Sequence, residues 1–333
     1  MREKEKSRKD DLSGVFARSA IGNAVFEEEF RSLFDEIANL KILSRESPVF
    51  DHIGKQKKII FLSRHNNEKE PSYLRDLVGA LMEGDENNKV ILLFELCSDF
   101  DLNEVIKLIN EDPRLFEKIS PFSENVTNLI KTLGKLKEKY GERFEVMLVD
   151  IPAAEVLKAT KDLSELAELA GIGLKSELTK RLNLSEEEFE SMSTKSKIEI
   201  LNTCNDIIET IINKIKDKIE SMEKSESISY EDIKNIEHIS RYFDLIFLNR
   251  NIKIVENVGK VYNGYKGEYN IFYGGLLHGL EILKELKEVE MPPSQKVTVY
   301  IPEENIPSAY EFLRSPTSKE LAKTDTFEKA LRH

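Results

Sequence analysis

The sequence contains no tryptophan and only two cysteines, Cys97 and Cys204. Two thiols cannot form the disulfide framework of a small secreted domain, so we expect two core thiols in a reducing compartment. No apolar stretch approaches the ~20 residues that cross a bilayer. The charged N-terminus is not followed by the apolar segment that a Sec signal peptide needs. We therefore expect a protein without a membrane span that is cytoplasmic, or exported by a non-Sec route.

Several common functional motifs are also missing. There is no G-x-x-x-x-G-K-[ST], no G-x-G-x-x-G after the first apolar run, no H-E-x-x-H, no C-x-x-C and no G-x-S-x-G. These absences argue against a nucleotide cofactor and a standard zinc protease. The formal net charge of −12 argues against a nucleic-acid partner, because phosphate contacts need a basic face.

Continuous apolar runs alternate with helical patterns along the chain. The runs predict buried strands at residues 57–63, 89–96, 144–150, 269–275 and 296–302. Pro302 ends the fifth run, which predicts an edge strand. A helical stripe is predicted over residues 23–43. Buried strands separated by helices indicate an α/β fold with a mostly parallel central sheet flanked by helices.

The domain organisation follows from the same patterns. Residues 1–20 are polar and predict a disordered segment. Residues 21–310 predict a single α/β domain, in which about 153–262 form a helical insertion or cap. Residues 311–333 form a polar tail.

Polar residues follow the predicted strands at the point where each strand ends. The carboxyl ends of parallel strands lie at one edge of a sheet, and ligands bind there. Glycines at such a place let backbone N–H groups approach a ligand. The residues concerned are His65, Glu95, Asp150, Gly274, Gly275 and His278.

Each of these residues also has an ordinary structural interpretation. A lone histidine in a loop is usually a surface or packing residue, and Asp150 before Ile151-Pro152 fits a helix N-cap. Glu95 lies inside LLFELC, where a buried carboxylate needs a partner. Arg250 is predicted near the start of an amphipathic helix, where it would form a salt bridge, clamp a carboxylate or stabilise an oxyanion.

Four short blocks carry a resemblance to a known superfamily. They are, in chain order, IIFLSRHNN, VILLFEL, LNRNIKIVENV and NIFYGGLLHGLEIL. Their order and spacing resemble the superfamily that groups the ChaN-like haem-binding proteins, the erythromycin esterases, and the TraB and Tiki proteins. The matched residues are His65, Asn66, Glu95, Arg250, Asn251, Gly275 and His278.

The resemblance implies hydrolysis of a small-molecule or peptide substrate by activated water. His65, Glu95 and His278 could hold manganese, cobalt or zinc, which would lower the pKa of bound water to about 7. Without a metal, one histidine could act as general base to a water that Glu95 orients. Arg250 and the amides around Gly275 would then stabilise the oxyanion. Asn66, Asp150, Asn251 and Gly274 would contact the ligand.

One departure from the superfamily pattern argues against esterase-type catalysis, and two alternatives to a hydrolase stay open. Many relatives have Gly or Gly-Glu before the first histidine, whereas this chain has Leu62-Ser63-Arg64. The first alternative is a non-catalytic protein that binds haem or iron, as the ChaN-like resemblance implies. The second is a secreted bacterial effector or toxin domain that engages a host protein.

Overall fold

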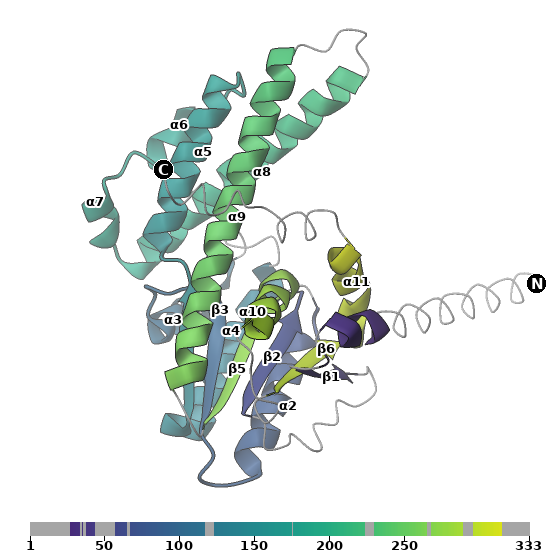
Figure 1. Cartoon of the computed structure of the whole chain (residues 1–333). Helices are drawn as coiled ribbons and strands as arrows, with labels where there is room; N and C mark the ends of the chain where they lie inside the picture. Colours follow the sequence, from purple (N-terminus) through teal and green to yellow (C-terminus); the bar gives the residue numbers. More distant parts are fainter. Residues whose placement is uncertain are drawn as a thin grey trace, which may run out of the picture. The chain divides into compact units, whose positions relative to one another are not determined.

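The computed structural model in Figure 1 describes most of the chain between residues 27 and 314. The described residues are 27–33, 35, 38–43, 57–64, 67–116, 123–174, 176–223, 230–264, 268–288 and 296–314. The predicted disordered segment 1–20 and most of the predicted tail 311–333 lie outside them.

A six-stranded parallel sheet confirms the α/β fold class, with the strand order β1-β6-β2-β5-β3-β4. The strands are β1 (Ala38–Leu43), β2 (Lys58–Ser63), β3 (Val90–Cys97), β4 (Phe144–Asp150), β5 (Tyr269–Gly275) and β6 (Val297–Pro302). The chain divides into two compact units, one formed by residues 1–64 with 273–333 and the other by residues 65–272.

The first unit contains β1, β2 and β6, and its helices include α10 (Leu276–Glu288) and α11 (Ile306–Arg314). Strand β6 pairs in parallel with both β1 and β2. Helix α10 packs on β2 so closely that a Cβ atom at Gly279 would lie 2.3 Å from Cδ2 of Leu62. Only glycine allows this approach between helix and strand without a shift of the neighbouring core.

Two sequence predictions are wrong in this unit. Of the helix predicted over residues 23–43, the described residues 27–33 are helical, whereas Ala38–Leu43 form strand β1. The ladder with β6, which pairs Leu40 with Val299, outweighs the helical spacing of the apolar residues. Because β1 flanks β6, strand β6 is an interior strand and Pro302 marks its end, not an edge.

The second unit contains β3 and β4, whose parallel ladder runs from Val90–Phe144 to Cys97–Asp150. Its helices up to β4 are α2 (Glu70–Glu83), α3 (Leu102–Glu111) and α4 (Ser123–Tyr140). Helix α4 packs against both α2 and α3. Gly141 follows α4 with a φ of +59°, the left-handed conformation that ends helices.

Helices fill the segment between β4 and β5. They are α5 (Ala153–Leu169), α6 (Ser176–Arg181), α7 (Glu186–Glu190), α8 (Thr194–Glu223) and α9 (Tyr230–Gly264). Helix α5 packs against α8 and α9, and α9 also contacts β4. The helix start predicted near Arg250 is wrong, because α9 runs without a break through this residue.

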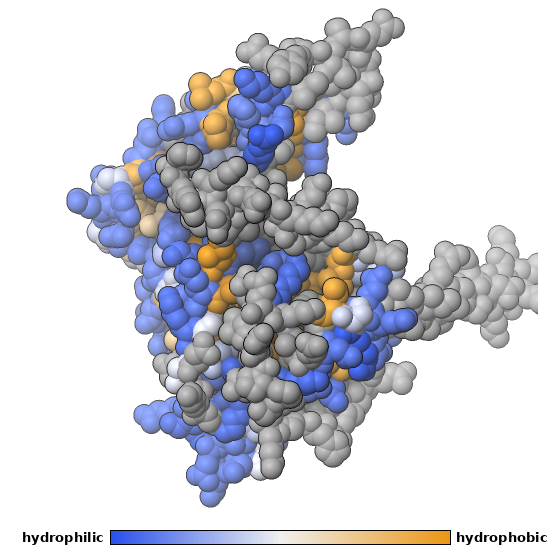
Figure 2. Space-filling view, in the orientation of Figure 1, coloured by the Kyte–Doolittle hydropathy of each residue, from blue (hydrophilic) through white to orange (hydrophobic). Residues whose placement is uncertain are grey.

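Within the described residues, no helix is long and apolar enough to span a membrane. The face drawn in Figure 2 is mostly hydrophilic where described residues form it, with smaller apolar areas. This distribution agrees with the 33% of charged residues in the sequence.

Candidate functional site

The guanidinium of Arg250 joins the carboxyl ends of β3 and β4 in the second unit. Its Nε atom lies 2.8 Å and 3.0 Å from the two carboxylate oxygens of Asp150. Its Nη2 atom lies 2.6 Å from Oδ2 of Asp150 and 2.7 Å from Oε1 of Glu95. Three of the residues predicted from the sequence are thus in direct contact, and their chemical role stays a prediction.

Burial makes this cluster electrostatically strong. The side chains of Glu95 and Asp150 are 7% and 8% exposed, and that of Arg250 is 34% exposed. Burial by itself lowers the pKa of the Arg250 guanidinium, but Asp150 and then Glu95 outweigh it and leave this pKa raised. The arginine is therefore a permanent cation that two carboxylates hold in one orientation.

Local structure explains how the three side chains meet. Strand β3 has an irregular register between Phe94 and Cys97, next to Glu95. Asp150 is the last residue of β4. Helix α9 is tied to the same strand by Asn257, whose Nδ2 donates to the carbonyl oxygen of Val149 at 3.1 Å. This bond lies about two turns beyond Arg250 and fixes the height of the guanidinium along β4.

The helix-cap interpretation of Asp150 is wrong. Its Oδ1 atom accepts the N–H of Ile151 at 2.8 Å, which lies before the helix. The N-cap position of α5 is occupied by Pro152, and the first helical N–H, that of Ala153, donates to Asp99 at 2.9 Å. Asp99 follows β3 and lies far from α5 in sequence, so no local pattern predicts this cap. Asp150 remains available to Arg250.

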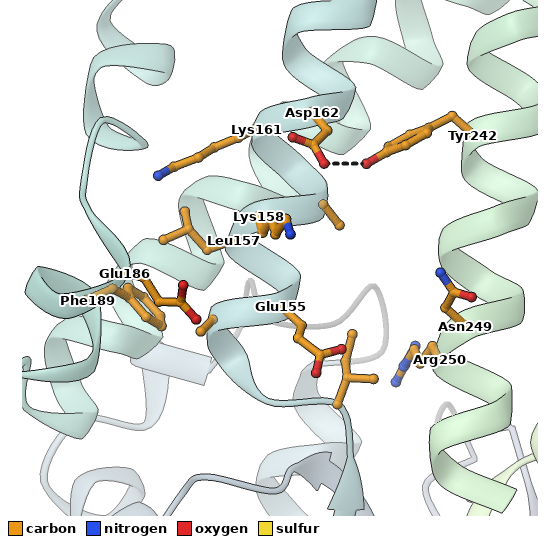
Figure 3. Close-up of a pocket in the computed structure, with 13 residues that line it drawn as sticks. Glu155, Leu157, Lys158, Lys161, Asp162, Glu186, Phe189, Tyr242, Asn249 and Arg250 are labelled. Carbon is orange, nitrogen blue, oxygen red and sulfur yellow. Dashed lines mark hydrogen bonds between the residues drawn. The ribbon is translucent and has the colours of Figure 1, made fainter. Parts of the chain in front are cut away.

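A pocket of about 570 Å³ opens at Arg250, lined mainly by α5 and α9 (Figure 3). Figure 3 shows Arg250 and Glu155 at one end of the pocket and Asp162 and Tyr242 at the other. The hydroxyl of Tyr242 donates to Oδ2 of Asp162 at 2.9 Å and so links the two helices. The volume falls in the range of small-molecule sites.

The pocket residues other than Arg250 were not predicted from the sequence. Asp162 and Tyr242 are 80 positions apart, and each lies in an ordinary helical pattern. Burial and the hydrogen bond to Asp162 raise the pKa of Tyr242, so its hydroxyl stays protonated at neutral pH. Spacing within one helix cannot signal a contact between two helices.

The remaining predicted site residues do not belong to this cluster. His65 and Asn66 lie outside the described residues. Asn251 is buried in α9 next to Arg250. Gly274 and Gly275 end β5, and His278 is buried, with 4% of its surface exposed, in the first turn of α10. These last three residues belong to the first unit, and a shared site with Glu95 stays a prediction.

Both cysteines are buried, as predicted from the sequence. Burial, and after it the charge of Asp150, raise the pKa of the Cys97 thiol well above its usual range. Burial raises the pKa of Cys204 to about 11. Neither thiol is a thiolate at neutral pH, and neither has the low pKa of a catalytic cysteine.

Within the described ranges, no group of three or more histidine, cysteine, aspartate and glutamate side chains is placed to hold a metal ion. Glu95 and Asp150 lie close together, but the guanidinium occupies the position between their oxygens. A metal ion at that point would meet the positive charge of Arg250. The predicted ligand set of His65, Glu95 and His278 includes a residue that is not described.

Comparisons with known proteins add little to this geometry. No protein-family model matches the sequence, and no curated protein matches it. Among solved structures, a crystal structure of a Bacillus cereus protein is similar with a TM-score of 0.34 and 13% sequence identity. The match covers 84% of this chain and 74% of that chain. A likeness of this size carries no argument about function.

Proposed function

We propose that the protein is a hydrolase of ester or amide bonds, as the resemblance to the erythromycin esterases and their relatives implies. One observation carries the proposal, namely that two buried carboxylates fix the Arg250 guanidinium at the end of a pocket. Among the described residues, its Nη1 atom has no hydrogen-bond partner. This nitrogen is thus available to an atom of a bound ligand.

The guanidinium is suited to the charge that forms during hydrolysis. When water adds to a carbonyl carbon, the carbonyl oxygen becomes an oxyanion, and a fixed donor stabilises it without reorganisation. Asp150 holds Arg250 through two oxygens, so the donor direction is set before the substrate binds. Removal of one such donor costs on the order of 10²–10³ in turnover in other hydrolases.

The other groups act on the attacking water. A histidine, His65 or His278 by the resemblance, takes a proton from water, and the hydroxide adds to the carbonyl carbon. The bond to the leaving alcohol or amine then breaks, and the protonated histidine returns the proton to that group. Glu95, whose carboxylate is paired with Arg250, orients the water. No step depends on a metal ion at the Arg250 cluster.

Hydrolysis of p-nitrophenyl acetate, p-nitrophenyl butyrate and an aminoacyl p-nitroanilide tests the proposal. We expect Arg250→Lys to lower kcat/KM about 100-fold, because lysine keeps the charge but loses the two-point hold of Asp150. Glu95→Gln should lower kcat by ~10²-fold with little change in KM. Circular dichroism checks that both variants remain folded.

Lys253→Gln is the matched control. Lys253 is also a cation on α9, but its partner is Glu256 at 3.7 Å and both side chains are about half exposed. The activity of Lys253→Gln should equal that of the wild type. Wild-type activity in folded Arg250→Lys and Glu95→Gln, or no turnover of any substrate by the wild type, would refute the proposal.

A further inference from the structure

The lining of the pocket at Arg250 carries acidic and basic side chains in equal number, and two further carboxylates lie behind it. Three of its residues are acidic, Glu155, Asp162 and Glu186, and Glu95 and Asp150 lie behind the guanidinium. Counted together, five carboxylates in or behind the lining face three cations, Arg250, Lys158 and Lys161. A cleft with such a balance attracts positively charged ligands and repels anions.

Two of the three cations are already engaged. Arg250 binds its two carboxylates, and Nζ of Lys161 donates to the carbonyl oxygen of Leu184. Figure 3 shows Lys161 turned away from Asp162 and Tyr242. Lys158 is exposed and is the pocket cation that remains without an ion-pair partner among the described residues.

Asp162 and Tyr242 form the part of the pocket best suited to a cation. The Tyr242 hydroxyl donates a hydrogen bond to Oδ2 of Asp162, and Oδ1 has no partner among the residues that the structure describes. A carboxylate oxygen next to an aromatic ring is an arrangement that binds ammonium groups, through charge and through the ring face. The pair lies at the end of the pocket opposite Arg250 (Figure 3).

We propose that the pocket selects substrates that carry an amine or quaternary ammonium group, which Asp162 and Tyr242 hold while the scissile carbonyl lies at Arg250. This inference rests on the proposed hydrolase function, and it adds the class of substrate. Asp162 and Tyr242 are specificity-determining residues, whereas Arg250 contacts the reacting atoms.

A pair of isosteric esters tests the selection. Acetylthiocholine and S-(3,3-dimethylbutyl) thioacetate differ by nitrogen against carbon, so they match in shape and differ by one charge. We expect kcat/KM to favour the cationic ester about tenfold, in line with one desolvated cation–π and ion contact. Asp162→Asn keeps an acceptor for Tyr242 but removes the charge, and it should reduce the preference to about twofold or less.

Lys158→Gln should change the preference between the two esters in the opposite direction to Asp162→Asn. Removal of this cation should raise the preference for acetylthiocholine, because it takes one positive charge from the pocket. Equal rates for the two esters in the wild type would overturn the inference. A second result would also overturn the inference, namely a wild-type preference for an anionic ester together with loss of activity in Lys158→Gln. The pocket would then be an anion site.

A binding measurement separates this inference from the hydrolase proposal. Choline and 3,3-dimethylbutan-1-ol are titrated into the wild type and Asp162→Asn, and line broadening of their methyl signals is measured. Selective choline binding that Asp162→Asn abolishes, without hydrolysis of any ester, supports the cation site and refutes the hydrolase. Hydrolysis of both esters at equal rates, without choline binding, supports the hydrolase and refutes the cation site.

Discussion

Replacement of Arg250 by methionine is the most direct perturbation of the cluster on β3 and β4. The change removes the charged hydrogen bonds to Asp150 and Glu95 and leaves both carboxylates without their cation. Methionine has a similar length and is apolar, so the space is largely refilled. The predicted effect is therefore electrostatic, with little contribution from a cavity.

The exposures set the expected magnitude. Loss of one partner from a buried ion pair costs roughly 3–5 kcal/mol, because the remaining charge is buried and unpaired. Glu95 and Asp150 are 7% and 8% exposed, but Arg250 is 34% exposed, and solvent already screens part of its charge. We therefore expect the lower end, a loss of about 3 kcal/mol in the free energy of unfolding.

Urea unfolding at pH 7, followed by circular dichroism, measures this loss. Lys253→Gln, whose ion pair with Glu256 is exposed, should lose less than ~0.5 kcal/mol. If Arg250→Met and Lys253→Gln unfold at the same urea concentration, the cluster is not the electrostatic anchor described here.

Further predictions concern other parts of the chain. Asp99→Ala removes the acceptor for the first N–H of α5 and should cost about 1 kcal/mol in urea unfolding, while wild-type stability would contradict the cap. Cys97 and Cys204 should react with Ellman's reagent only after unfolding; rapid labelling of the native protein would contradict their burial. Because the pKa of Cys204 rises from 9.0 to about 11, the unfolded thiol ionises first, and stability should fall as pH rises between these values. Calorimetry with manganese, cobalt or zinc tests the metal site that the resemblance implies: binding that His278→Ala weakens would support this site, and equal, negligible binding by both proteins would remove it. Addition of the protein should leave the Soret band of free haemin unchanged if the protein is a hydrolase alone, and a shift and sharpening of this band that saturates at a stoichiometric ratio would favour the haem-binding alternative.

Strands that are buried on both faces were predicted with the least ambiguity. The runs at residues 57–63 and 89–96 match β2 and β3 within one residue at each end. Their signal is local, because a strand covered on both faces must be apolar at every position. Strand β1 was missed because its apolar residues also fit a helical stripe, and only the pairing with β6 decides between the two structures.

The site residues also divide into those that the sequence predicted and those that it did not. Glu95 and Asp150 were found because each polar residue lies at the carboxyl end of an apolar run, where it is conspicuous. Arg250 was found through its neighbours in sequence, but its place in the middle of α9 was not. Asp162 and Tyr242 were not found, since nothing local distinguishes a helical aspartate or tyrosine that faces a pocket from one that faces water.

The sequence by itself determined the parallel α/β class and the strand ends that carry the acidic residues, because burial on both faces leaves a direct mark on residue type. The tertiary structure alone decided which cation pairs with those carboxylates, which helices enclose the pocket and which strand pairs with β6 at the edge of the sheet. Those outcomes depend on contacts between residues that are 80 or more positions apart. Such contacts arise from the packing of whole elements, and local patterns of apolar residues do not encode them.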